Sequence, residues 1–168
     1  MKNRIRATRL CSMVLVALLA LWASIGLAAD PAAALTVVGA DGAKRSWSLE
    51  DLRRLPAQEF TAIDPWEKAP HAYRGVLLTE VIKASGHALK PWIWVFASNG
   101  YKVGVSWKDA ARMGHILAFD MDGLALADHP KGSNKAPLMV AIPFTADSDV
   151  EVYKHQLVWM VASLELKE

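Results

Sequence analysis

Residues 92–105 read WIWVFASNGYKVGV, and they carry the clearest structural signal in the chain. Side chains alternate in character from Trp92 to Ser98, with the period of a β-strand. Asn99-Gly100 is the strongest short signal for a hairpin, because both residues tolerate the positive φ that a tight turn requires. Tyr101 to Val105 is then the return strand. The stretch predicts an antiparallel β-hairpin.

The flanking sequence continues as short strands separated by short helices. We expect strands at residues 35–39, 44–47, 57–63, 115–121, 124–127, 137–143 and 157–166, and helices at 49–55, 78–85 and 107–113. The last strand is almost continuously hydrophobic, which is typical of a central position in a sheet. Strands do not alternate regularly with helices. The pattern therefore predicts an α+β fold with mixed β-sheets.

Turn and cap residues set the boundaries of these elements. Ser48 with Asp51 three residues later resembles a capping box, and the helix that follows ends before Pro56. Ser106 with Asp109 repeats the pattern. Residues 64–71 contain two prolines and predict an irregular stretch, and residues 128–136 predict a polar loop.

The first 29 residues have the composition of an export signal. Four cations, at Lys2, Arg4, Arg6 and Arg9, precede an apolar run over residues 10–27 and small residues at 26, 28 and 29. This order predicts a cleaved signal peptide over residues 1–29 and a single periplasmic or secreted domain over 30–168. The alternative is an uncleaved anchor, because residues 10–29 are long enough to span a bilayer. That anchor would be the only link to a membrane.

Composition excludes several classes of protein. The chain has 168 residues, of which 53% are hydrophobic, so it is far too apolar to be disordered. Lys and Arg number 19 against 17 Asp and Glu; without the first 29 residues the balance is 15 against 17, a net charge of −2. No basic cluster is interleaved with aromatic residues. We therefore expect no nucleic-acid partner.

Motifs for covalent catalysis and for nucleotide binding are missing from the sequence. There is no G-x-S-x-G elbow, P-loop or dinucleotide fingerprint, and the single cysteine, Cys11, lies in the predicted signal peptide. The five histidines at positions 71, 87, 115, 129 and 155 include no i, i+4 pair and no H-x-H motif. We predict no catalytic nucleophile and no metal site built from protein side chains alone.

Candidate ligand-binding residues come from aromatic and polar side chains in irregular segments. Trp66 lies where no periodicity demands burial, with Tyr73 and Arg74 following it; together they suit a flat or anionic ligand. Asn99 and Tyr101 occupy the hairpin turn. Structural explanations stay open: Trp66 closing one end of the core, Asn99 serving only the turn, and Arg74 paired with Asp64 or Glu80. Trp92, Trp94 and Trp159 are expected in the core.

Five short motifs follow one another in a recognisable order: residues 48–52 with Pro56, Tyr73-Arg74-Gly75-Val76-Leu77-Leu78, Asn99-Gly100-Tyr101, Asp122-Gly123, and Pro137-Leu138 with Pro143. In this order they resemble the sulfite-oxidase-type molybdopterin-binding domain, over most of residues 35–166. The resemblance implies a mixed α+β fold with a β-grasp-like element. It also makes Lys154 a candidate, since a basic residue follows an aromatic one shortly before the last strand in that family.

The resemblance also defines what this chain lacks. Redox-active members hold molybdenum through a cysteine thiolate, and the aligned position here is Ala62 or a residue beside it; alanine offers no ligand atom, and no cysteine lies nearby. Cations for a pterin phosphate would have to come from Arg74, Lys102, Lys108, Arg112 and Lys154. The chain is also shorter than the catalytic domains of that family.

Two hypotheses follow. The first is an exported module that binds an unknown small ligand or contacts a membrane sensor protein, with Trp66, Tyr73, Arg74, Asn99, Tyr101 and Lys154 as its ligand-binding residues. The second is a periplasmic molybdopterin-dependent oxidoreductase that holds its cofactor without a protein thiolate.

Overall fold

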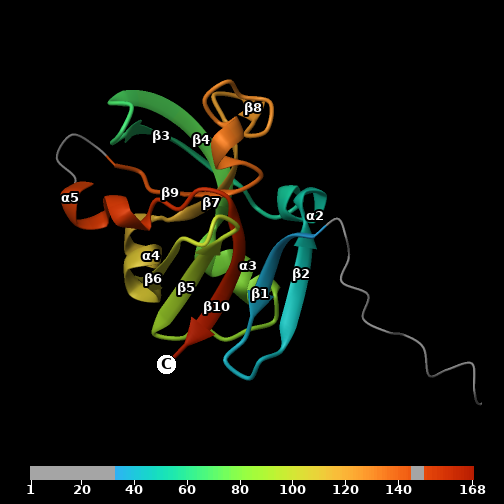
Figure 1. Cartoon of the computed structure of the whole chain (residues 1–168). Helices are drawn as coiled ribbons and strands as arrows, with labels where there is room; N and C mark the ends of the chain where they lie inside the picture. Colours follow the sequence, from blue (N-terminus) through green and yellow to red (C-terminus); the bar gives the residue numbers. More distant parts are fainter. Residues whose placement is uncertain (1–32, 145–149) are drawn as a thin grey trace, which may run out of the picture. The chain divides into compact units, whose positions relative to one another are not determined.

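Two β-sheets organise the chain in the computed structural model, which describes residues 33–144 and 150–168 (Figure 1). The predicted signal peptide lies outside these residues. Residues from Ala32 to Glu168 form one compact unit. Within the described ranges, no helix has both the length and the apolar character needed to cross a membrane.

The first sheet has the strand order β2-β1-β10-β5-β6. Its members are β1 (Ala33–Val38), β2 (Lys44–Ser48), β5 (Trp92–Ala97), β6 (Lys102–Ser106) and β10 (Val161–Lys167). β1 and β10 pair in parallel at the middle of the sheet. β1 also belongs to the hairpin β1–β2, and β10 pairs on its other side with β5 of the hairpin β5–β6. This arrangement is β-grasp-like. It places β10 at the centre of the sheet, as the hydrophobic sequence of that strand predicts.

The second sheet has the order β3-β4-β7-β8, with β9 also paired to β7. Its members are β3 (Gln58–Asp64), β4 (Ala69–Leu77), β7 (Ile116–Met121), β8 (Leu124–Ala125) and β9 (Met139–Ala141). Every residue of β7 is buried. Leu117 and Phe119 join the core shared with the first sheet, while Ile116 and Ala118 join a smaller core on the opposite face. β7 is therefore the wall between two cores.

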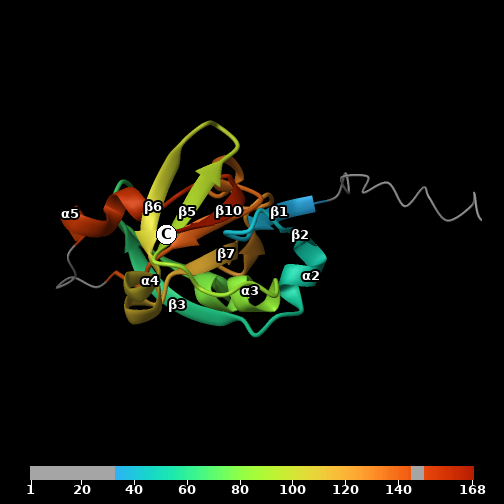
Figure 2. The same cartoon turned by 90° about the horizontal axis from the view of Figure 1, so that it is seen from below.

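Short helices close the ends of the sheets. They are α2 (Leu49–Arg53), α3 (Leu78–Ala84), α4 (Trp107–Met113) and α5 (Val150–Tyr153), with 3₁₀ turns η2 (Ser133–Lys135) and η3 (Lys154–Gln156). α3 buries Leu78, Val81 and Ile82 in the main core beside the first sheet (Figure 2). Ser48 caps α2 by accepting the Asp51 N–H, as predicted, whereas Ser106 makes no such side-chain bond at α4.

Gly75 explains one of the sequence motifs in physical terms. A Cβ at this position would lie 2.2 Å from the carbonyl oxygen of Leu117, and the register between β4 and β7 shifts between Arg74 and Gly75. Only glycine allows the two strands to approach so closely here. Substitution of Gly75 by any larger residue would push β4 away from β7.

Several boundary predictions were wrong. β4 begins at Ala69, so Pro70 and His71 are strand residues and not part of an irregular stretch. Pro70 fits because this part of β4 pairs only with β3, and pairing to β7 begins at Tyr73. β10 begins at Val161 instead of residue 157, since the chain turns at Met160, where φ is 54°. Strand β9 is shorter than the predicted range 137–143.

All three predictions that placed tryptophans in the core were wrong. Trp94 is half-buried on the same face of β5 as Trp92 and belongs to neither core. Trp92 is 46% exposed, although it lies in β5 as expected, because its side chain points away from the core. Trp159 lies before β10, outside the strand, and is only partly buried.

Candidate functional site

Four of the predicted ligand residues line one pocket. The cavity has a volume of about 310 Å³, at the lower end of the range for small-molecule sites. Its lining residues are Trp66, Asn99, Tyr101, Lys154, His155, Leu157 and Trp159. They come from the turn between β3 and β4, the β5–β6 hairpin loop, and the segment that runs from η3 to the start of β10. Three segments far apart in the sequence thus form the site.

Trp66 is positioned by the carboxylate that ends β3. Asp64 Oδ1 accepts the backbone N–H groups of Trp66, at 2.9 Å, and Glu67, at 3.1 Å. The Trp66 ring meets Trp159 edge-on, with ring centroids 5.5 Å apart. Trp66 is 51% exposed, so it does not close the end of the core. It is an aromatic wall of the pocket.

The hairpin loop supplies polar groups to the same pocket. Asn99 Oδ1 accepts the Tyr101 N–H at 3.0 Å, which uses the amide oxygen and leaves the amide N–H groups available. The Tyr101 hydroxyl donates to the His155 carbonyl at 2.6 Å and so ties the hairpin to η3. Lys154 Nζ pairs with Glu151 at 2.6 Å; the Lys154 side chain is partly buried, whereas that of Glu151 lies largely in solvent. The polar groups left for a ligand are mainly donors.

The structure separates Tyr73 and Arg74 from the other four candidates. Tyr73 is 3% exposed and belongs to the smaller core, where burial and the charges of Asp64 and Glu67 raise its pKa. Arg74 lies over the Phe119 ring and contacts Asp120 at 3.3 Å. Its partner is thus neither Asp64 nor Glu80. The expectation that all six residues share one pocket is wrong for these two.

Sequence reasoning missed three lining residues, namely His155, Leu157 and Trp159. Trp159 and Leu157 were assigned to a strand, and His155 was one of several scattered histidines. The usable signal was their proximity in sequence to Lys154.

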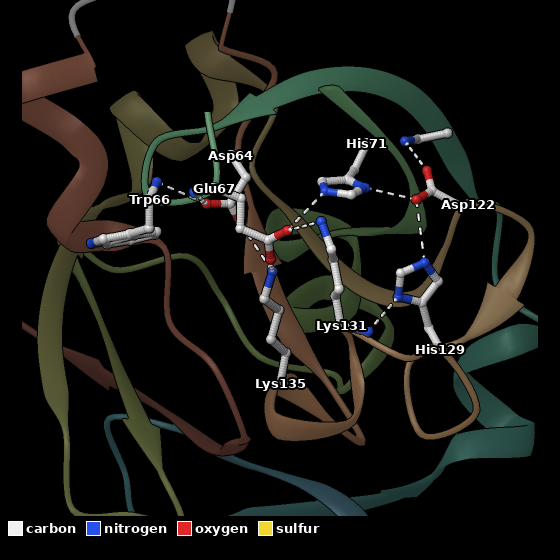
Figure 3. Close-up of polar contacts among 9 residues, drawn as sticks. Asp64, Trp66, Glu67, His71, Asp122, His129, Lys131 and Lys135 are labelled. Atoms are coloured by element: carbon white, nitrogen blue, oxygen red, sulfur yellow. Dashed lines mark hydrogen bonds and ion pairs between the residues drawn. The ribbon is translucent and has the colours of Figure 1, made fainter. Parts of the chain in front are cut away.

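A cluster of charged residues lies beside the pocket (Figure 3). We call it the ion cluster; it consists of Asp64, Glu67, His71, Asp122, His129, Lys131 and Lys135. Lys135 is its most buried member, with a side chain 1% exposed. Its Nζ lies 3.0 Å from both Asp64 Oδ2 and Glu67 Oε1, and 5.2 Å from the centre of the Trp159 ring. Lys135 therefore links the cluster to the wall of the pocket.

The two carboxylates that His71 contacts have lowered pKa values. Burial alone would raise the pKa of Glu67, but hydrogen bonds from Lys131, Lys135 and His71 outweigh it and lower the pKa to about 2. Burial likewise opposes the shift at Asp122, where hydrogen bonds from His71 and the Ala72 N–H lower the pKa. Both side chains are held as anions near neutral pH.

The residues present do not fit a molybdenum centre held by a protein thiolate. Ala62 is 3% exposed and packs in the smaller core. Among the residues that the structure describes, no three His, Cys, Asp or Glu side chains are grouped to hold a metal ion. The cations proposed for a phosphate do not converge: Arg112 pairs with Asp109, and Lys154 alone lines the pocket.

Comparisons with known proteins support the fold. No family model matches the chain, and no curated protein matches it significantly. Among solved structures, it is similar to the sulfane dehydrogenase SoxCD from Paracoccus pantotrophus, with a TM-score of 0.60 and 17% sequence identity. The match covers 78% of this chain and 37% of that one. At this identity the likeness shows the fold alone, and it agrees with the sulfite-oxidase-like α+β architecture expected from the sequence.

Proposed function

We propose that this chain is an exported binding module that uses an oxidoreductase-like scaffold to hold a small, flat ligand. The observation that carries the proposal is the pocket itself, where Trp66 and Trp159 supply aromatic walls and Asn99 and Lys154 supply donors. Aromatic walls with a few fixed polar groups are typical of small-molecule sites. A ligand with an aromatic ring system and an anionic or carbonyl edge suits this lining best.

The composition of residues 1–29 supports export to the periplasm or beyond. The bound group is either a free small molecule or a part of a membrane sensor protein. The pocket favours a free ligand, because its volume of about 310 Å³ is that of a small molecule.

A second candidate is a periplasmic molybdopterin-dependent oxidoreductase, favoured by the structural likeness to a sulfane dehydrogenase. Against it stands Ala62 in place of a thiolate ligand, with Cys11 as the chain's single cysteine. A soft metal would then depend on the pterin sulfurs alone. We therefore place this activity second.

The test begins with the protein purified after export from a host that makes the cofactor. Mass spectrometry for molybdenum and fluorescence of oxidised pterin are measured on the same sample. Near-stoichiometric amounts of both would overturn the binding-module proposal in favour of the oxidoreductase. Pterin without molybdenum would identify the ligand class.

A binding assay then tests the pocket directly, with pterin-6-carboxylate as a flat anionic probe. Trp66→Ala is expected to weaken binding at least about tenfold, the effect of losing one aromatic wall. Lys154→Met is expected to lower the affinity for this anionic probe a few-fold and to leave the affinity for the neutral 6-methylpterin unchanged. Lys108→Met is the matched control, because Lys108 lies on α4 and does not line the pocket. Equal affinities for all variants would overturn the assignment of the site.

A further inference from the structure

His71 is held between two carboxylates. Its Nδ1 lies 2.7 Å from Asp122 Oδ2, and its Nε2 lies 3.3 Å from Glu67 Oε2 (Figure 3). A carboxylate only accepts hydrogen bonds, so both ring nitrogens must donate, and only the protonated imidazolium has two donors. A neutral ring would turn one lone pair toward a carboxylate oxygen. The arrangement therefore favours the protonated ring over the neutral one.

The neighbouring histidine has a different role. His129 Nδ1 accepts the Lys131 backbone N–H at 3.1 Å, so that nitrogen carries no proton. Its Nε2 then donates toward Asp122 Oδ2 at 3.3 Å. His129 is thus a neutral ring in this arrangement, and His71 is the histidine that carries the charge.

Charge counting leads to the same assignment. The three carboxylates of the ion cluster are balanced by Lys131, Lys135 and a protonated His71. The other titratable neighbour of His71 is Tyr73, whose ring centroid is 6.3 Å away and whose raised pKa keeps it a neutral phenol. Loss of the His71 proton would leave one negative charge in excess in a half-buried site.

The cluster is joined to the ligand pocket through the turn between β3 and β4. Glu67 follows Trp66 directly and binds both His71 and Lys135. Lys135 lies over Trp159, which contacts Trp66. When His71 becomes neutral, Glu67 loses one partner and is repelled by a lone pair. The turn that carries Trp66 then loses its contact with β4 through His71, while its bonds to Asp64, Lys131 and Lys135 remain.

We propose that the proton on His71 holds Trp66 in its pocket position, so that the pocket binds its ligand more tightly when His71 is charged than when it is neutral. The inference rests on the proposed function, because it concerns the same pocket. The expected direction is that affinity falls as the pH rises far enough to remove the proton from His71.

The first experiment uses no ligand and so is independent of the binding proposal. NMR follows the indole N–H of Trp66 and the imidazole of His71 in the purified protein from about pH 5 upward until the imidazole has lost its proton. We expect the Trp66 resonance, identified with Trp66→Phe, to shift with the midpoint of His71. His71→Gln should abolish that shift, whereas His87→Gln, outside the cluster, should keep it. A Trp66 resonance that does not respond while His71 titrates in the wild-type protein would overturn the inference.

The second experiment measures affinity for pterin-6-carboxylate across the same range. We expect the wild-type protein to lose about fivefold or more in affinity from the acidic to the alkaline end, and His71→Gln to show a flat profile. A wild-type profile as flat as that of the variant contradicts the inference. If the probe binds at no pH, the ligand class in the proposed function fails, and the NMR titration still decides the role of His71.

Discussion

Lys135 Nζ and Asp64 Oδ2 lie 3.0 Å apart, with side chains only 1% and 2% exposed, and the two residues are separated by 71 positions in the sequence. This pair joins the end of β3 to the polar segment before β9. Asp64 also accepts the N–H groups that fix the Trp66 turn. One buried ion pair therefore connects the second sheet with the ligand pocket.

Removing one partner of this pair is expected to destabilise the protein strongly. Lys135→Met should lower the free energy of unfolding by about 3–5 kcal/mol, because it leaves Asp64 as an uncompensated buried charge. Adding Asp64→Asn should recover part of the loss, since the amide oxygen still accepts the turn N–H groups. Urea denaturation of the two variants and the wild type measures the effect. If Lys135→Met lowered the free energy of unfolding by no more than the loss of an exposed salt bridge does, about 0–1 kcal/mol, the result would contradict a buried pair.

The lowered pKa of Glu67 predicts how stability depends on acid. A carboxyl group whose pKa is lower in the folded state stabilises the fold above its unfolded pKa, and that contribution is lost as the pH falls toward the folded pKa. For Glu67 the window runs from the ordinary glutamate pKa of 4.5 down to about 2. Unfolding free energies measured across this window should fall less steeply in Glu67→Gln. Some slope should remain in the variant, because the pKa of Asp122 is also lowered.

Arg74 provides a test that separates stability from binding. Arg74→Ala should lower the unfolding free energy by about 0.5–1 kcal/mol, since its side chain is 44% exposed and solvent weakens the pair with Asp120. Arg53→Ala should cost more, because Arg53 binds both oxygens of Asp120 and is less exposed. Affinity for pterin-6-carboxylate should be unchanged in both variants. A weaker affinity in Arg74→Ala with normal stability would return Arg74 to the ligand site.

Local sequence signals predicted much of the fold because turns and caps are local. Asn99-Gly100 predicted the β5–β6 hairpin, in which Gly100 has a φ of 88°. The predicted helices 78–85 and 107–113 both stop directly before a glycine that has a positive φ in the structure, Gly86 and Gly114. The start of β4 was missed because Pro70 is tolerated where a strand has a neighbour on one side only. Such tolerance depends on the partner strands, which the sequence around Pro70 does not contain.

The candidate site was predictable only in part. Aromatic and polar residues in turns suggested Trp66, Asn99, Tyr101 and Lys154, which do line one pocket. The ion cluster gave no local signal, because its members come from the end of β3, the β3–β4 turn, the start of β4, the β7–β8 turn and the segment around η2. Lys135 in particular was expected only as part of a polar loop over residues 128–136. Its burial depends on carboxylates brought close by the pairing of distant strands.

Ala62→Cys tests whether the scaffold retains a cofactor site that lacks only its thiolate. The side chain of Ala62 is enclosed in the smaller core with Tyr73 and Met121, so the new thiol should be buried and inert. We expect the variant to fold and to contain no more molybdenum than the wild type after export from a host that makes the cofactor. Ala97→Cys is a control for a buried thiol elsewhere, because Ala97 belongs to the main core. Molybdenum in Ala62→Cys alone would mean that the pterin site is otherwise intact, and it would favour an oxidoreductase ancestry for the pocket over the binding of an unrelated ligand.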